Sequence, residues 1–156
     1  VGDQYALFYI GNNLKRAENF DGHHASTQRI GLALADNIYG PYTRVSDEPI
    51  LDVSEDKKQW DSYLTTNPAF LMHPNGEYWL YYKAWDRNND NMRKMGLAIA
   101  KDIRGPDKKH KANPLAANYY PEGPPAASLI TLHFDKTSKT DSNVELIWMD
   151  GGLFGH

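Results

Sequence analysis

The sequence predicts an all-β fold in which one antiparallel sheet is repeated, and two strand patterns support this prediction. The aromatic run at residues 5–9 recurs 73 positions later, at residues 78–82. The small apolar run at residues 30–35 recurs 65 positions later, at residues 95–100. The later landmarks Gly40-Pro41 and Pro49 return at the second offset as Gly105-Pro106 and Pro114. Self-similarity at a fixed spacing indicates a repeat architecture.

Each run is predicted to be a strand on local grounds. Residues 78–82 are rich in aromatic side chains, are too short for a helix and follow the turn signal Pro74-Asn75-Gly76. Residues 30–35 are short and apolar, which fits a strand buried on both faces. A helix is the main rival interpretation of this run. It fails on length, because residues 37–41 end with the loop signal Gly40-Pro41.

Opening strands are expected before these pairs. Residues 67–72 should form a hairpin with residues 78–82, and residues 144–149, followed by Asp150-Gly151, repeat that pattern. The first copy has no such strand, because only four residues precede Tyr5. The connection between the aromatic run and the small apolar run is eight residues longer in the first copy than in the second. Residues 107–111 are expected to form a solvated charged turn.

Small antiparallel sheets repeated at this spacing are typical of a β-propeller, whose four-stranded blades surround a central axis. We therefore expect a single propeller segment over residues 1–156. It would hold part of a blade at about 1–51, a full blade at about 60–115 and the start of the next at about 128–156. Propellers close with roughly four to eight blades. Either several copies assemble, or the missing blades belong to the same polypeptide. An open sandwich of two duplicated sheets remains an alternative.

Composition narrows the function classes. The 156 residues carry a net charge of −3 and no cysteine. The near-neutral balance predicts neither nucleic acid nor an anionic membrane as a partner. No apolar run approaches the roughly 18 residues of a membrane span. The absence of cysteine excludes disulfides, thiol nucleophiles and Cys-type zinc sites.

An ordered series of motifs resembles the five-bladed β-propeller glycoside hydrolases, in particular the family 43-like group, which is related to the family 117 and family 32 propellers. The motifs are residues 5–11, 28–33, 40–42, 49–51, 60–61, 66–68 and 82–83. The resemblance implies hydrolysis of glycosidic bonds in plant or algal oligosaccharides and polysaccharides. It also favours a secreted or periplasmic location, although the residues themselves do not fix the compartment.

The resemblance implies catalysis by three carboxyl groups. An aspartate acts as general base, a glutamate as general acid, and a second aspartate tunes the acid. The acid and the base must be in different protonation states. An inverting mechanism needs about 6.5–9.5 Å between these two carboxyl groups, which leaves room for the attacking water. These groups lie on the opening strands of successive blades, so the base is expected upstream of Val1.

Asn67 stands where the family commonly has the aspartate of an Asp-Pro pair. An amide cannot serve as a charged partner, so the role could move to Asp61, six residues earlier. A loop-capping aspartate is the alternative for Asp61. Glu145, at the start of the last opening strand, is the candidate general acid. Its alternative is an exposed glutamate at a strand edge.

Other residues are candidates for sugar binding. Trp60, Trp85 and Trp148 lie at strand ends or in loops, where aromatic rings would face the central funnel of a propeller and stack on a sugar. Asn67 could form hydrogen bonds with sugar hydroxyls. Arg29 and Lys83 occupy otherwise apolar strands, which favours either a wet cavity or a structural ion pair.

No cofactor is expected. Family propellers sometimes hold a structural calcium ion on the axis, but no ligands for it can be named. A polar loop tip is favoured over a metal site for His23-His24. A carbohydrate-binding or purely structural propeller without catalysis remains the alternative function.

Overall fold

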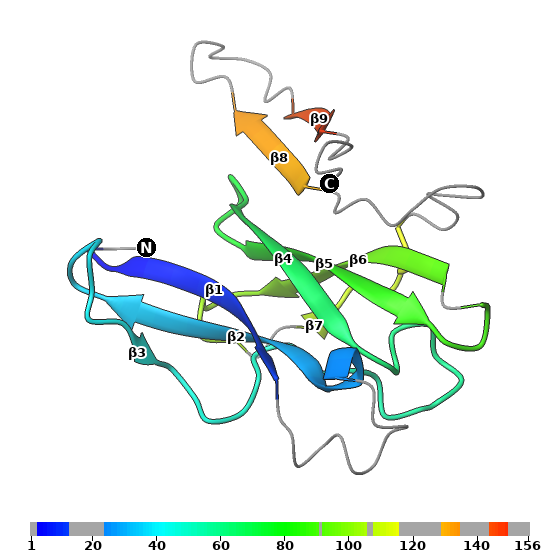
Figure 1. Cartoon of the computed structure of the whole chain (residues 1–156). Coiled ribbons are helices and arrows are strands. Elements are labelled where there is room, and N and C mark those ends of the chain that lie inside the picture. The colour runs from blue at the N-terminus through cyan, green and yellow to red at the C-terminus, as the bar shows by residue number, and fades with distance from the viewer. Residues whose placement is uncertain are drawn as a thin grey trace, which may run out of the picture. The chain divides into compact units, whose positions relative to one another are not determined.

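The computed structural model describes residues 3–12, 24–90, 92–105, 108–115, 129–134 and 144–149. The chain divides into two units, residues 1–119 and residues 120–156. The first unit contains two antiparallel sheets, and the second contains one hairpin (Figure 1). No helix in the described part of the chain is long and apolar enough to cross a membrane.

The first sheet has the strand order β1-β2-β3. Its strands are β1 (Tyr5–Asn12), β2 (Gln28–Ala35) and β3 (Thr43–Arg44), and the short 3-10 helix η1 (His24–Thr27) leads into β2. Tyr9 pairs with Gly31 across β1 and β2. A side chain at Gly31 would meet the Tyr9 ring, so the ring fits only because its partner is glycine.

The second sheet has the strand order β4-β5-β6-β7. Its strands are β4 (Thr65–Met72), β5 (Tyr78–Asp86), β6 (Met92–Ala100) and β7 (Lys108–Lys109). The predicted hairpin is present, with Gly76 in the turn at a φ of 88°. Tyr82 pairs with Gly96, and here too a Cβ on the glycine would meet the tyrosine ring.

The repeat extends to single hydrogen bonds. Val45 N donates to Leu32 O at 3.0 Å, and His110 N donates to Leu97 O at 2.8 Å, 65 positions later. Gly40 and Gly105 are equivalent in the same way, with φ angles of 84° and 85°. Both glycines occupy the left-handed region that side chains disfavour. The two sheets are therefore copies of one unit, and the first lacks an opening strand.

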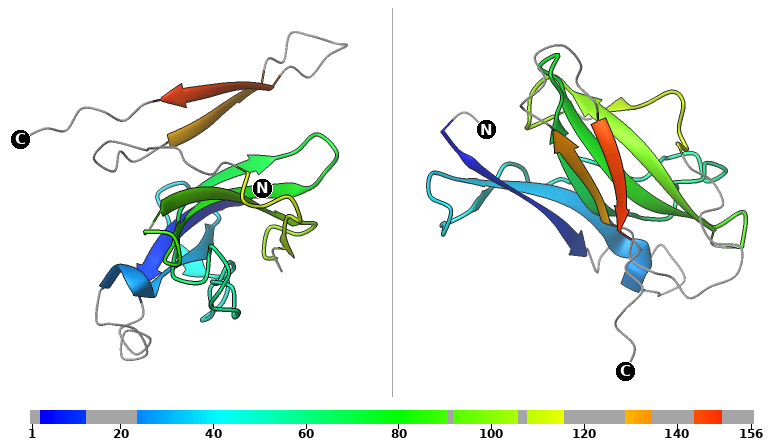
Figure 2. Two further views of the ribbon diagram at one scale, coloured as in Figure 1. Left: turned by 90° about the vertical axis from the view of Figure 1, so that its right-hand side faces the viewer. Right: turned by 90° about the horizontal axis from the view of Figure 1, so that it is seen from above.

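The two sheets pack face to face within the first unit (Figures 1 and 2). The Phe8 and Phe70 rings stack across the interface, with centroids 4.7 Å apart. The main core cluster contains Ile30 from β2 with Leu80 and Tyr82 from β5. Alternation along each strand places these residues on the facing surfaces, so β5 directs its odd-numbered residues to the opposite face.

Within the first unit, strands β3 and β7 are the parts that the sequence pattern missed. Residues 107–111 were expected to form a charged turn, but Lys108 and Lys109 form the outer strand β7. Lys108 pairs with Ile99, and Lys109 pairs with Ala98. Two-residue strands carry no alternation, so they are recognised only through their position relative to the repeat.

The second unit contains β8 (Leu129–Phe134) and β9 (Val144–Met149), paired antiparallel. The strand predicted at residues 144–149 is thus present, but β8 precedes it and pairs with it, so β9 is not the first strand of this sheet. The described strands of both units are antiparallel throughout, as predicted. The proposed boundaries of the three blade segments remain a prediction.

Candidate functional site

Polar side chains gather at one end of the second sheet, where β4 begins, β5 ends and β6 begins. Asn67 lies there in a β-bulge between Thr66 and Ala69, with a φ of 50°. Thr66 Oγ1 lies 2.9 Å from Asn67 Oδ1. A left-handed asparagine at a bulge is an uncommon conformation that often accompanies a functional site.

Lys83 lies opposite Thr66 in the same sheet and is 9% exposed. Burial, followed by the nearby charge of Arg93, lowers the pKa of Lys83 below its ordinary value. No carboxylate of the described residues pairs with it. The nearest carboxylate along the strand is that of Asp86, which forms an ion pair with Lys94 at 2.7 Å. Asp86 also lies on the other face of β5, by strand alternation.

Trp85 belongs to a row of four side chains in which two aromatic rings stack and each ring also contacts one guanidinium group. The Arg93 guanidinium lies 4.4 Å from the centre of the Trp85 ring, and Arg87 lies 4.6 Å from that of Tyr63. The Tyr63 and Trp85 rings stack at 6.2 Å. Cation–π attraction stabilises a guanidinium placed over an aromatic ring. Trp85 thus lies at the polar end of the sheet with Arg93 over its ring, and its use as a sugar platform stays a prediction.

Asp61 is only 2% exposed, and its carboxylate is fully engaged. Lys109 Nζ forms an ion pair with Asp61 Oδ2 at 2.7 Å. Tyr82 OH donates to the same oxygen at 2.9 Å, and Ser54 Oγ donates to Oδ1 at 2.5 Å. Burial and the Asp61 charge raise the pKa of the Tyr82 hydroxyl. This network joins the loop before β4 to strands β5 and β7.

Arg29 is buried and also fully engaged. Its Nε donates to Asp52 Oδ1 at 2.5 Å. Its Nη1 donates to the carbonyls of Ser26 at 2.9 Å and Gln28 at 2.7 Å. Trp60 stacks on Tyr82 at 5.7 Å, at the margin of the core between the sheets. Neither residue lies on the face of β5 that carries Lys83 and Trp85.

Glu145 and Trp148 lie on β9, opposite His133 and Ile130 respectively. Their side chains lie outside the described residues. His23 also lies outside the description, whereas His24 begins η1.

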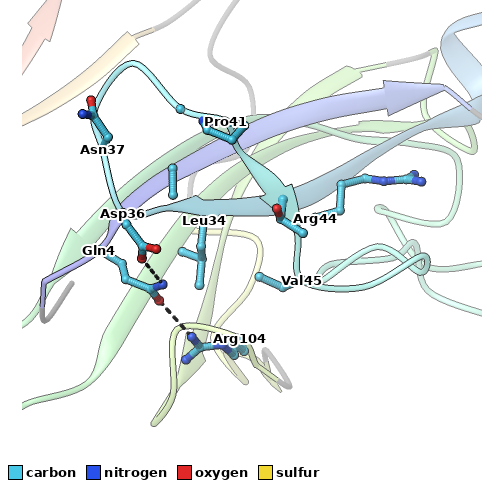
Figure 3. A pocket seen from close by; sticks show the side chains of 11 residues that line it. Gln4, Leu34, Asp36, Asn37, Pro41, Arg44, Val45 and Arg104 are labelled. Carbon is cyan, nitrogen blue, oxygen red and sulfur yellow. Dashed lines mark hydrogen bonds between the residues drawn. The ribbon is translucent and has the colours of Figure 1, made fainter.

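An open hollow of about 510 Å³ lies at the other end of the strands, beside the start of β1 and the end of β2 (Figure 3). Its polar groups bond to one another. Gln4 Nε2 donates to Asp36 Oδ1 at 2.9 Å, and Arg104 Nη2 donates to Gln4 Oε1 at 3.1 Å. Gln4, Asp36 and Arg104 therefore already have hydrogen-bond partners within the protein, unlike Arg93 Nε near Lys83, so we do not assign the hollow a ligand.

Three important residues escaped sequence reasoning. Arg93 could have been found by extending the register of the repeat from Lys83 and Trp85 to the neighbouring strand. Lys109 could not, because it reaches Asp61 from the outer strand β7, distant in sequence, and no pattern in the preceding loop marks Ser54 as a partner of Asp61. Among the described residues, no group of three or more His, Cys, Asp or Glu side chains is arranged to hold a metal ion.

The sequence matches no protein-family model and no curated protein. Among solved structures, its fold is similar to that of a family 117 glycoside hydrolase from the marine bacterium Zobellia galactanivorans. That match has a TM-score of 0.64 at 24% identity and covers 97% of this chain and 41% of the other. A second match is a GH43 β-xylosidase/α-arabinofuranosidase from a compost microbial metagenome. It has a TM-score of 0.60 at 18% identity and covers 87% of this chain and 37% of the other.

An exo-β-1,3-galactanase from Phanerochaete chrysosporium gives a TM-score of 0.57 at 17% identity, covering 95% of this chain and 30% of the other. The chain therefore spans between 30% and 41% of the length of these structures. The likeness confirms the predicted all-β fold of propeller blades. The number of blades in a closed ring stays a prediction.

Proposed function

We propose that this chain is a segment of a glycoside hydrolase that cleaves glycosidic bonds in plant or algal oligosaccharides and polysaccharides. The observation that carries the proposal is the fold likeness to family 117 and family 43 glycoside hydrolases over nearly the whole chain. The polar end of the second sheet adds support, because there Lys83, which has no anionic partner among the described residues, lies on the same face as the Trp85 ring. Aromatic faces and convergent polar groups are what sugar sites require.

In this proposal Glu145 is the general acid that protonates the leaving oxygen. Asp61 was the candidate second carboxylate, but its burial and its three donors favour a structural role in joining the loop before β4 to the sheet. We propose instead that the other catalytic carboxylates lie outside these 156 residues. Asn67, Lys83 and Trp85 would then contact the sugar, and Trp148 would supply a platform from β9. For Arg29 and Trp60, the observed contacts favour structural roles.

Hydrolysis of aryl glycosides and short oligosaccharides by the full-length or assembled form tests this function. General acid catalysis contributes about 10²–10⁴-fold, so Glu145→Gln should lower kcat by that factor. Glu55→Gln, in an exposed loop, is the matched control and should retain activity. Full activity of Glu145→Gln would remove Glu145 from the mechanism, and inactivity of the wild type on every glycoside would overturn the proposal.

A carbohydrate-binding propeller without catalysis is the second candidate. It is favoured by Asn67, whose neutral amide replaces the expected aspartate. Sugar-dependent quenching of tryptophan fluorescence without release of product would support this candidate over the hydrolase. Quenching together with product release would support the hydrolase.

Assembly with further blades is a separate proposal. Within the described residues β1 pairs only with β2, which leaves its other edge open. Tyr5 and Leu7 on the same strand are 45% and 46% exposed. Open edges and exposed apolar side chains favour pairing with another strand. Sedimentation should therefore show self-association of the 156-residue chain, whereas a well-behaved monomer would contradict this proposal.

A further inference from the structure

Two cations lie close together on the face of the second sheet that points away from the first sheet. Lys83 and Arg93 come from neighbouring strands, because Lys83 pairs with Met95 and Trp85 pairs with Arg93. They are therefore diagonal neighbours on one face. Their proximity also appears electrostatically, since the charge of Arg93 contributes to the lowered pKa of Lys83.

Neither cation has an anionic partner among the described residues. Elsewhere in the first unit, buried or half-buried cations are paired: Arg29 with Asp52, Lys94 with Asp86 and Lys109 with Asp61. Arg93 Nε is buried and has no hydrogen-bond acceptor in the described part of the chain. A charge without a partner is costly when it is buried, as Lys83 is, and less so when it is half-buried, as Arg93 is, so the two side by side indicate that an anion completes the arrangement.

The first sheet shows that the fold itself does not require these charges. By the offsets of the repeat, Lys83 corresponds to Ile10, and Arg93 corresponds to Gln28. Both pairs occupy the same register of their sheets. An apolar and a neutral polar side chain therefore serve at these positions in the other copy, and the two cations are an addition specific to the second sheet.

We propose that Lys83 and Arg93 bind the negatively charged group of an acidic sugar, either a uronate carboxylate or a sulfate ester. Two convergent donors fit the oxygens of such a group, and Trp85 beneath Arg93 would contact the sugar ring. Asn67, at the bulge beside Thr66, lies at the same end of the sheet and supplies amide groups for hydroxyls. This inference rests on the proposed function and narrows its substrate class to anionic glycans.

The repeat also supplies the test variants. Lys83→Ile and Arg93→Gln install the residues of the first copy, and Lys101→Met removes an exposed cation at the far end of the sheet as the matched control. The probes are an oligogalacturonide, a sulfated galactan oligosaccharide and a neutral galacto-oligosaccharide of the same length. Binding is measured by calorimetry and by Trp fluorescence, on the full-length or assembled form.

The wild type should bind one of the acidic probes at least tenfold more tightly than the neutral one, and each variant should lose roughly tenfold of that affinity. The acidic probe that binds more tightly identifies carboxylate or sulfate as the recognised group. Lys101→Met should bind like the wild type. Thermal unfolding of Lys83→Ile should occur at or above the wild-type temperature, because it removes a buried charge that has no partner among the described residues. Arg93→Gln, which also loses the contact with the Trp85 ring, should unfold close to the wild-type temperature.

Three results would overturn the inference: equal affinity for neutral and acidic probes, unchanged affinity in both variants, or a large fall in the melting temperature of both. The last result would mean that an acidic side chain of the protein already pairs with the two cations. Hydrolysis of neutral glycosides in any of these cases would leave the proposed function standing. Binding of no sugar at all would remove both.

Discussion

The two sheets of the first unit share a backbone plan but differ in chemistry. The pair Tyr9–Gly31 in the first sheet and the pair Tyr82–Gly96 in the second occupy the same register. The two tyrosines are 73 positions apart and the two glycines are 65 positions apart. Tyr82 is fully buried and bonded to Asp61, whereas Tyr9 is half-buried. The comparison shows which features the blade requires, such as the tyrosine–glycine pair. It also shows which features are specific to the second sheet, such as its polar network and the cations Lys83 and Arg93, which no described carboxylate pairs.

The largest expected effect comes from the buried charge of Asp61, in the loop before β4. Asp61→Asn removes the partner of Lys109 and weakens the acceptor of Tyr82, so it should lower the free energy of unfolding by about 3 kcal/mol. Asp52→Asn is the counterpart beside the first sheet. Because Asp52 is 41% exposed, its loss should cost about 1 kcal/mol. Urea unfolding of both variants checks this, and equal losses would contradict the assignment of Asp61 as a structural centre.

The tyrosine–glycine pairs should respond unequally to the same substitution. Gly96→Ala places a methyl group against a Tyr82 ring whose hydroxyl is held by Asp61 and Asn113. Overpacking of this kind should cost about 2–3 kcal/mol. Gly31→Ala meets the half-buried Tyr9, whose ring can move aside, so about 1 kcal/mol is expected. A larger loss at Gly31 would show that the first sheet is the more rigid of the two.

A smaller effect concerns alkaline pH. Burial raises the pKa of Tyr82 in the folded protein, so the folded state keeps the proton after the unfolded chain has lost it, above about pH 10. The stability from the neutral hydroxyl is therefore present below that pH and is lost as the pH rises further. Between pH 8 and 11, the free energy of unfolding should fall more steeply with pH in the wild type than in Tyr82→Phe. Tyr9→Phe controls for loss of a strand tyrosine, and identical slopes for wild type and Tyr82→Phe would contradict the raised pKa.

The sequence predicted the strands that carry a clear pattern. Aromatic and small apolar runs gave β1, β2, β5 and β6, and the turn at Gly76 gave the hairpin with β4. Strand β7 was missed, because the two lysines that form it resemble a solvated turn. Its position follows only from the repeat of the outer-strand pairing seen in β3.

The candidate site was harder to predict, for a physical reason. A single sequence shows that a carboxylate or cation exists, but not what surrounds it. Asp61 is a catalytic candidate by sequence, and the fold places Lys109 and Ser54 beside it. Arg29 likewise has Asp52 and carbonyl partners, whereas Lys83 has no such partner in the described part of the chain. These contacts appear only in the folded chain, and they are the basis on which we propose structural roles for Asp61 and Arg29.

The central claim is that the Lys83 end of the second sheet binds carbohydrate, and β5 carries its own control. Trp79 and Trp85 lie on the same face of this strand, six residues or about 20 Å apart. Trp79 stacks on His73 at the far end. Indole NMR signals of the full-length or assembled form, assigned with Trp→Phe variants, should be followed during titration with an acidic oligosaccharide. We expect the Trp85 signal to shift and the Trp79 signal to stay in place. A shift of Trp79 alone, or of neither, would contradict the account.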